Sequence, residues 1–164
     1  MDAKPYIDIL HKRYKLYYNI NKDVNILDET LDIFAQFKDI QGRTFLTSKD
    51  IIDTFEINEI CFVKHFDSFD ATYLSQFIEF LKKAVLKYVE PKQGHMCSYI
   101  TGVIITEDHL DDKLKRLIRK FKYSKSYFFT LQGWSEVRLL LINPAKEEII
   151  ANKPGRKVIK FYKF

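Results

Sequence analysis

The run of residues 96–106 constrains the fold of this chain more than any other segment. It consists mostly of β-branched, aromatic and small residues and carries no charge, which is typical of a strand buried on both faces of a sheet. Gly102 within the run indicates that another part of the chain approaches this strand closely. A strand of this kind needs a layer of structure on each side, so we expect a sheet flanked by helices.

Apolar residues recur at helical spacing in three other segments. The first begins at Pro5, a residue that the first turn of a helix accepts, and extends to about Tyr18. The second follows Asp70, which is a good N-cap, and is stopped by Pro91. The third is expected to follow Thr106 as its N-cap. Its acidic residues precede its basic residues, which is the order that the helix dipole favours.

The remaining strands are predicted from alternation of apolar and polar side chains and from turn residues. Residues 19–25 are polar and predict a loop, whereas residues 31–38 alternate and predict a strand. Two further strands, residues 43–55 and 57–66, are expected to complete an antiparallel meander. After the third helix, the pattern predicts strands over residues 125–131, 135–143 and 147–152 and a short basic helix or strand over residues 156–164.

The order of these elements predicts the architecture. We expect an α+β fold with a mixed sheet, built from an antiparallel β-meander plus a β-α-β crossover and C-terminal hairpin and flanked by helices. No repeat or break in composition divides residues 1–164, so we expect a single domain. A domain of this size can bury roughly 70% of the surface that its unfolded chain exposes, so it needs no disulfide or metal to build a core.

Charge is distributed unevenly along the chain. Residues 1–112 contain 13 basic and 19 acidic residues, whereas residues 113–164 contain 14 basic and 3 acidic residues. Two basic clusters lie in this last third, the first over residues 113–125 and the second over residues 153–163. If they fold onto one face, that face attracts a polyanion, with nucleic acid as the leading candidate. The alternative is a solvated helix face followed by a basic tail. The candidate binding residues are Lys115, Arg116, Arg119, Lys120, Lys122, Arg156, Lys157 and Lys160.

A second candidate site surrounds the single tryptophan. Gly133 allows a turn before Trp134, and Glu136 and Arg138 project from the same face of the strand that follows. These residues form either a ligand or partner site, or a structural ion pair under a packed tryptophan. The consecutive apolar residues 139–142 predict a strand that is covered on both faces, and we expect Trp134 to contribute most of its apolar area to the core.

The segment of residues 125–143, KSYFFTLQGWSEVRLLLIN, is similar to a stretch in uncharacterised proteins of low-GC Gram-positive bacteria. The resemblance covers the last two thirds of the chain and implies no activity. A bacterial origin agrees with the composition, because 21 Lys against 6 Arg and 19 Ile against 6 Ala are the bias expected of an AT-rich genome.

The five glycines are isolated, which excludes a P-loop and a dinucleotide-binding fingerprint. The order of helix, meander, helix and strand resembles the core of the PD-(D/E)XK nuclease fold, whose members hold Mg²⁺ with an Asp and a Glu-x-Lys motif. Asp50, Asp53, Glu59 and Lys64 are available for such a site, but Glu59 and Lys64 are five apart and face opposite sides of a strand. A metal-dependent nuclease-like hydrolase and a purely structural protein are therefore the alternatives. We assign no catalytic residue, metal ligand or cofactor.

The two cysteines indicate the compartment. Cys61 and Cys97 lie far apart and have no partner at disulfide or zinc spacing, so we expect reduced thiols. Charged residues occupy the N-terminus where a signal peptide needs an apolar core, and no apolar run is long enough to span a bilayer. We expect a cytoplasmic protein with no membrane partner. The oligomeric state is left open.

Overall fold

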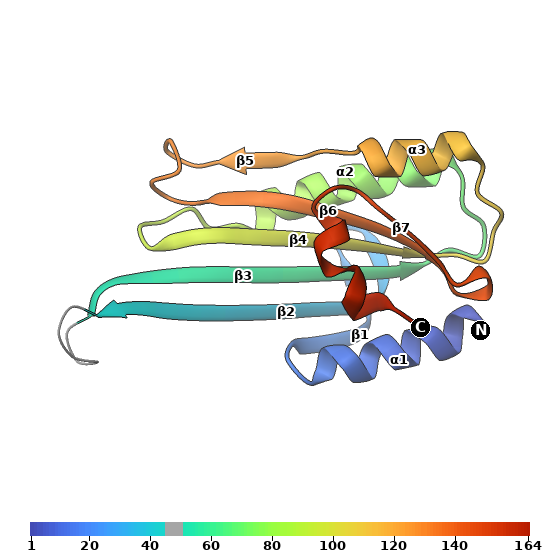
Figure 1. Cartoon of the computed structure of the whole chain (residues 1–164), viewed down its shortest axis with the longest axis horizontal. Coiled ribbons are helices and arrows are strands. Elements are labelled where there is room, and N and C mark those ends of the chain that lie inside the picture. Colours follow the sequence, from blue (N-terminus) through green and yellow to red (C-terminus); the bar gives the residue numbers. More distant parts are fainter. Residues whose placement is uncertain (45–50) are drawn as a thin grey trace.

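A seven-stranded mixed sheet runs the length of the molecule (Figure 1). The computed structural model describes residues 1–44 and 51–164, and it describes side chains outside residues 40–55. The strand order is β1-β2-β3-β4-β6-β5, and β7 also pairs with β6. The elements are α1 (Ala3–Lys15), β1 (Asn19–Ile26), β2 (Glu29–Thr44), β3 (Ile51–His65), α2 (Ala71–Tyr88), β4 (His95–Ile105), α3 (Asp112–Lys120), β5 (Ser124–Ser126), β6 (Trp134–Asn143), η1 (Pro144–Lys146), β7 (Glu148–Ala151) and η2 (Gly155–Tyr162).

The pairing pattern confirms the predicted α+β class. Strands β1, β2 and β3 form an antiparallel meander, whereas β3, β4 and β6 are parallel to one another. Helix α2 makes the crossover from β3 to β4, and α3 lies in the connection from β4 to β6. The antiparallel strand β7 returns along β6 and forms the expected C-terminal hairpin.

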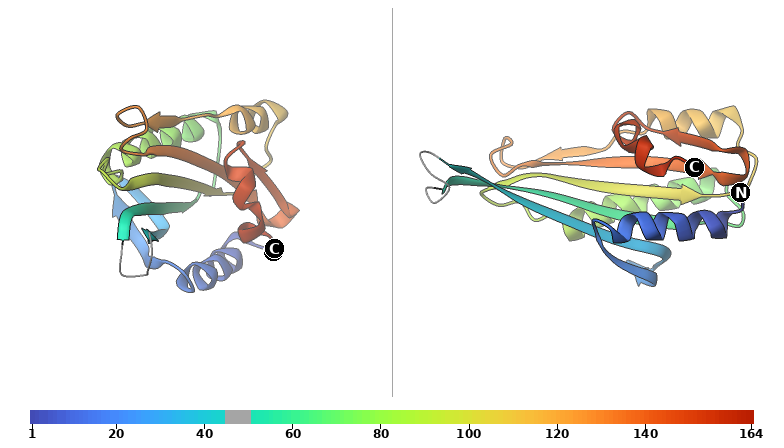
Figure 2. Two further views of the ribbon diagram at one scale, coloured as in Figure 1. Left: turned by 60° about the vertical axis from the view of Figure 1, so that its left-hand side comes forward. Right: turned by 60° about the horizontal axis from the view of Figure 1, so that its bottom comes forward.

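Helices cover both faces of the sheet, and each covered face has its own core (Figure 2). Helices α2 and α3 pack on a cluster that includes Phe62, Ile100 and Leu139. Helix α1 and the 3₁₀ helix η2 pack on the opposite face, where Tyr14 and Tyr162 are buried and their hydroxyl groups are 2.6 Å apart. The alternation of side chains along each strand divides the apolar residues between these two cores.

The strongest sequence signals are confirmed. Asp70 caps α2 by accepting hydrogen bonds from the backbone N–H groups of Thr72 and Tyr73. Residues 139–142 of β6 are fully buried, and β4 is buried along most of its length. Gly102 lies under α2, because a Cβ atom at this position would be 2.5 Å from Leu81 Cδ1 and 3.0 Å from Phe77 Cε1. The expected close approach is therefore made by side chains of this helix.

The strands of the meander differ from the expectation. Residues 19–25, expected as a loop, lie in β1, a mostly exposed edge strand whose polar sequence hides its pairing with β2. The boundary expected at residue 56 is wrong, because β3 continues through it from Ile51 to His65. Part of the expected strand 43–55 lies outside the described residues.

The third helix begins later than expected. Its N-cap is Asp111, whose Oδ1 accepts a hydrogen bond from Leu114 N at 2.7 Å. Thr106 instead accepts a hydrogen bond from Asp108 N within the preceding loop. The expected strand over residues 125–131 is also mostly wrong, since β5 has three residues and a turn follows it. The basic C-terminal segment is the 3₁₀ helix η2.

Candidate functional site

One end of one face of the sheet is left uncovered by the helices of the described residues. Strands β3, β4 and β6 extend well beyond α1 and η2, which lie over the other half of the same face (Figures 1 and 2). Four residues form one row across the uncovered strands, since they are successive partners in the strand pairing. We call this region the open half-face, and its row consists of Phe37, Glu59, Tyr99 and Glu136.

Arg138 lies beside this row and is 7% exposed. Its Nη1 donates a hydrogen bond to Glu59 Oε1 at 3.0 Å, and its guanidinium carbon lies 3.6 Å from the centre of the Tyr99 ring. Glu59 also accepts hydrogen bonds from Thr101 Oγ1 and from the hydroxyl group of Tyr18. The buried charge of Arg138 is thus paired with Glu59 on β3, and the sequence could not show this partner because it is 79 residues away.

Trp134 is partly buried, so most of its surface is covered as expected, but it belongs to neither of the two apolar core clusters. Its indole ring meets the Tyr99 ring edge to face, with centroids 5.4 Å apart. In the described part of the chain no helix lies over this end of the face (Figure 1), and part of the indole stays in contact with solvent.

Replacing Trp134 with alanine is expected to lower the free energy of unfolding by about 1–2 kcal/mol, because one aromatic pair and part of the buried area are lost. Urea denaturation followed by circular dichroism measures this loss. Trp134→Phe keeps an aromatic contact with Tyr99 and is expected to lose less. A loss above about 3 kcal/mol for the alanine variant would show that the indole is a core residue.

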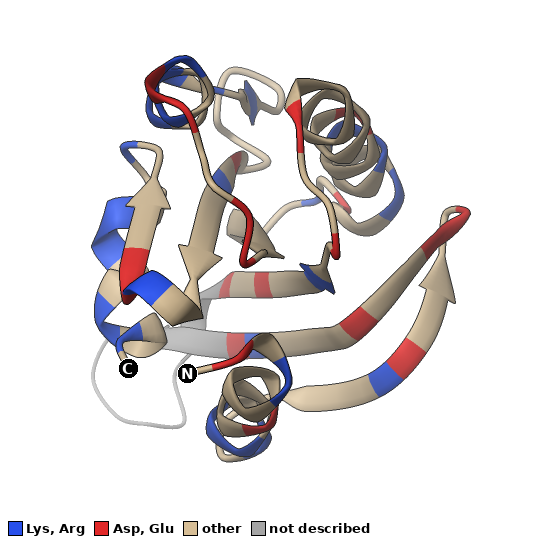
Figure 3. Cartoon of the chain, turned by 90° about the vertical axis from the view of Figure 1, so that its right-hand side faces the viewer, with Lys and Arg blue, Asp and Glu red and all other residues tan. Residues whose placement is uncertain are grey.

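The two basic clusters meet around one cavity of about 460 Å³. The cavity lies between the end of α3 and the start of η2, beside β5 and β6. Figure 3 shows Lys and Arg on both α3 and η2. We call this cavity the basic pocket, and it is lined by Arg119, Lys120, Phe121, Lys122, Tyr123, Ser124, Glu136, Lys153, Pro154 and Lys157.

The pocket unites four of the eight predicted binding residues, namely Arg119, Lys120, Lys122 and Lys157, with Lys153. None of these five cations forms a salt bridge with a carboxylate in the described part of the chain. Glu136 is the acidic residue of the lining and connects the basic pocket to the open half-face. Lys153 belongs to the second basic cluster but was not among the predicted binding residues.

The other predicted binding residues lie elsewhere. Lys115 forms a partly buried salt bridge with Glu148 at 2.7 Å, so its charge is already neutralised by β7. Arg116 and Arg156 are exposed and do not line the basic pocket. Lys160 lines a smaller neighbouring cavity of about 270 Å³, which shares Lys157 with the basic pocket.

Asn152 holds the walls of the basic pocket together and is fully buried. Its Oδ1 accepts hydrogen bonds from Leu139 N at 3.0 Å and Gly155 N at 2.9 Å. Its Nδ2 donates to the carbonyl oxygens of Val137 at 3.0 Å and Phe121 at 3.3 Å. One side chain therefore joins the end of α3, the outer edge of β6 and the start of η2. Sequence reasoning missed this role, because Asn152 has no motif of its own.

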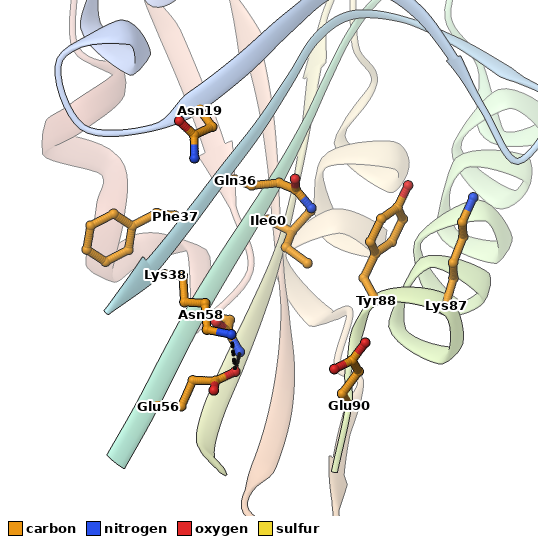
Figure 4. A pocket seen from close by; sticks show the side chains of 10 residues that line it. All are labelled: Asn19, Gln36, Phe37, Lys38, Glu56, Asn58, Ile60, Lys87, Tyr88 and Glu90. Atoms are coloured by element: carbon orange, nitrogen blue, oxygen red, sulfur yellow. Dashed lines mark hydrogen bonds and ion pairs between the residues drawn. The ribbon is translucent and has the colours of Figure 1, made fainter. Parts of the chain in front are cut away.

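A different pocket of about 340 Å³ lies on the α2 side, near the end of this helix (Figure 4). It contains none of the predicted site residues. One of its two carboxylates, that of Glu56, receives a hydrogen bond from Asn58 and salt bridges from Lys38 and Lys92. Although burial raises the pKa of Glu56, these donors lower it to about 2. The carboxylate is therefore satisfied by the protein itself.

The residues considered for a nuclease site are not brought together. Glu59 lies on the open half-face, whereas Lys64 faces the other side, where it pairs with Glu29 and lies 5.0 Å from the centre of the Phe66 ring. Asp50 and the side chain of Asp53 are outside the described residues. The described residues contain no group of three or more His, Cys, Asp or Glu arranged to hold a metal ion.

Among the described helices, none is long and apolar enough to cross a membrane. Comparison with known proteins identifies no curated protein and no solved structure that matches this chain. One family model, described as "Domain of unknown function (DUF8052)", matches residues 2–164. Because this match covers almost the whole chain, the protein belongs to that uncharacterised family.

Proposed function

We propose that this protein is a non-catalytic binding module whose basic pocket binds an anionic ligand, with nucleic acid as the leading candidate. The observation that carries the proposal is the group of five cations around one cavity, none of which pairs with a described carboxylate. The cations come from two segments about thirty residues apart in sequence, and Asn152 fixes these segments against each other.

Electrostatics supports this proposal over a solvated helix face. Like charges that are held around one cavity repel each other, and a bound anion relieves this repulsion. The one acidic residue of the lining, Glu136, leaves a large excess of positive charge. Phosphate groups suit such a site because they carry charge and accept several hydrogen bonds from lysine and arginine side chains.

The expected location is the cytoplasm of a bacterium. Both cysteines are free and buried, and burial raises the pKa of the Cys61 thiol, which agrees with a protein that keeps reduced and unreactive thiols. The excess of lysine over arginine supports a genome of low GC content.

Fluorescence-anisotropy titrations with single-stranded DNA, double-stranded DNA and RNA test the proposal. Affinity is expected to fall roughly 20- to 100-fold between about 50 and 200 mM salt, because about three to five phosphate contacts release bound counterions. The double variant Lys122→Glu/Lys157→Glu is expected to bind at least about 10-fold more weakly, with a shallower salt dependence.

The matched control is Lys4→Glu/Lys12→Glu, which makes the same change of charge at two exposed positions of α1. This control is expected to change affinity less than about 3-fold, since the basic pocket stays intact. Equal losses in the two variants would indicate attraction by net charge alone. Lack of binding by the unaltered protein at about 50 mM salt would exclude nucleic acid as the ligand.

A further inference from the structure

We infer that the nucleic acid is single-stranded, with phosphates in the basic pocket and bases stacked on Phe128 and Phe129. This inference rests on the proposed function and names its ligand more closely. The observation behind it is a turn over residues 127–132, which lies outside the lining of the basic pocket and exposes apolar side chains. Phe128, Phe129 and Leu131 in this turn are 66%, 91% and 70% exposed, and Phe129 is the most exposed large apolar side chain of the described residues.

The turn is held in one conformation although it exposes these rings. Phe128, Phe129 and Thr130 have φ values of 47°, 50° and 71°, a region that such residues rarely adopt. Backbone hydrogen bonds within the turn join Leu131 N to Phe128 O and Gly133 N to Thr130 O. The outward position of the two rings is therefore built into the fold.

Side chains from β4 and β6 anchor the base of the turn. His95 is buried, and its Nδ1 lies 2.7 Å from Gln132 O while its Nε2 lies 2.8 Å from Ser98 Oγ. The hydroxyl group of Tyr127 is 2.9 Å from Ser135 Oγ. A turn with these contacts presents Phe128 and Phe129 without a large loss of backbone conformational entropy when a ligand binds.

Strand β5 connects this turn directly to the basic pocket. Lys122 to Ser124 line the pocket, β5 ends at Ser126, and the turn begins at the next residue. The six steps along the chain from Lys122 to Phe128 span at most roughly 20 Å when extended. On the neighbouring strand, Glu136 lines the pocket and the partly exposed Trp134 is the next residue on the same face. Cations and aromatic rings thus follow one another along the β5 edge of the sheet. Figure 1 shows β5 connecting the end of α3 to this turn.

The sequence of cations followed by aromatic rings matches the chemistry of single-stranded nucleic acid better than that of other anions. A single strand alternates charged phosphates with flat, unpaired bases that stack on aromatic side chains. In a duplex the bases are stacked on each other, so Phe128 and Phe129 would have nothing to stack on. A free phosphate or a mononucleotide would occupy the basic pocket and leave the turn unused.

The test compares labelled 12-nucleotide single strands of DNA and RNA with a duplex of 12 base pairs, using the full chain. The unaltered protein is expected to prefer the single strands by at least about 10-fold. Phe128→Asn/Phe129→Asn removes both rings and keeps residues that tolerate positive φ. This variant is expected to lose about 5- to 100-fold in affinity for the single strands, with an unchanged salt dependence because the phosphate contacts remain.

Leu16→Asn/Tyr17→Asn is the matched control, because these residues are 72% and 69% exposed at the end of α1, away from the turn. It is expected to change affinity less than about 2-fold. Trp134 provides a second signal, since it is the only tryptophan and lies between the pocket and the turn. Single strands are expected to change its fluorescence, and this change is expected to shrink in the Phe128→Asn/Phe129→Asn variant.

Several results would overturn the inference. Equal binding of single strands and duplex, or full binding by the Phe128→Asn/Phe129→Asn variant, rejects the inference. The proposed function still stands in that case if the Lys122→Glu/Lys157→Glu variant binds at least about 10-fold more weakly than the unaltered protein. Vesicles that contain phosphatidylserine form a further arm. If loss of the two rings weakens binding to these vesicles and leaves binding to the oligonucleotides unchanged, the turn contacts a lipid surface instead. If no oligonucleotide binds, both the inference and the nucleic-acid proposal are wrong.

Discussion

Replacing Asn152 with alanine is expected to lower the free energy of unfolding by about 3–4 kcal/mol. The fully buried side chain makes four hydrogen bonds to backbone groups, two as acceptor and two as donor. Alanine leaves these buried groups without their partner, and the loss of one partner in such a site costs about 1–3 kcal/mol. Urea denaturation at 25 °C, followed by far-ultraviolet circular dichroism, measures the loss.

Two further variants separate the hydrogen bonds of Asn152 from its volume. Asn152→Asp has almost the same shape but places an acceptor against the carbonyl oxygens of Val137 and Phe121, so we expect it to be about as destabilising as alanine. Asn21→Ala changes an exposed asparagine of β1 and is expected to cost less than about 0.5 kcal/mol. A loss below about 1 kcal/mol for Asn152→Ala would contradict the proposed role.

The Asn152 variant also links stability to the site. No charge of the basic pocket is removed, yet the end of α3 and the start of η2 lose their common partner. Under conditions where the variant is folded, nucleic-acid affinity is therefore expected to fall in the same anisotropy titration. Unchanged affinity would show that the two walls keep their positions without Asn152.

Local periodicity was sufficient for elements whose own residues show which positions are buried. The α2 stripe and the apolar β4 run were recognised because helices and strands repeat their buried positions at different spacings. Strand β1 was missed because it forms by pairing with β2, whereas its own residues are mostly polar and exposed. The start of α3 was misplaced because both Thr106 and Asp111 are residue types that cap helices well. The sequence does not show that Thr106 bonds within the loop and that Asp111 caps the helix.

The candidate site could be predicted only in part. The basic clusters were visible as sequence, but their meeting depends on β5 and β7 pairing with the same strand, β6. Lys115 and Lys122 look alike in the sequence and differ in the structure, since only Lys115 has Glu148 within reach. The exposure of Trp134 depends on how far α1 and η2 extend over the face, which no local pattern contains.

Gly133→Ala is expected to lower the free energy of unfolding by about 2–5 kcal/mol. Gly133 has a φ of 85°, which costs an alanine roughly 1–2 kcal/mol. A Cβ atom would also lie 2.5 Å from His95 O and 2.8 Å from Met96 O. These are backbone atoms of β4, so no change of side-chain rotamer relieves the contact, and overpacking of this kind adds about 1–3 kcal/mol.

Gly133→Asn distinguishes the two causes of this loss, because asparagine tolerates a positive φ better than alanine. If backbone conformation dominated, the asparagine variant would recover most of the stability in urea denaturation. We expect it to recover little, since its Cβ meets the same carbonyl oxygens. The contact would also push the 127–132 turn away from His95, whose ring holds Gln132 O. Both Gly133 variants are therefore expected to weaken single-strand binding even where they are folded, because the turn that presents Phe128 and Phe129 loses its anchor.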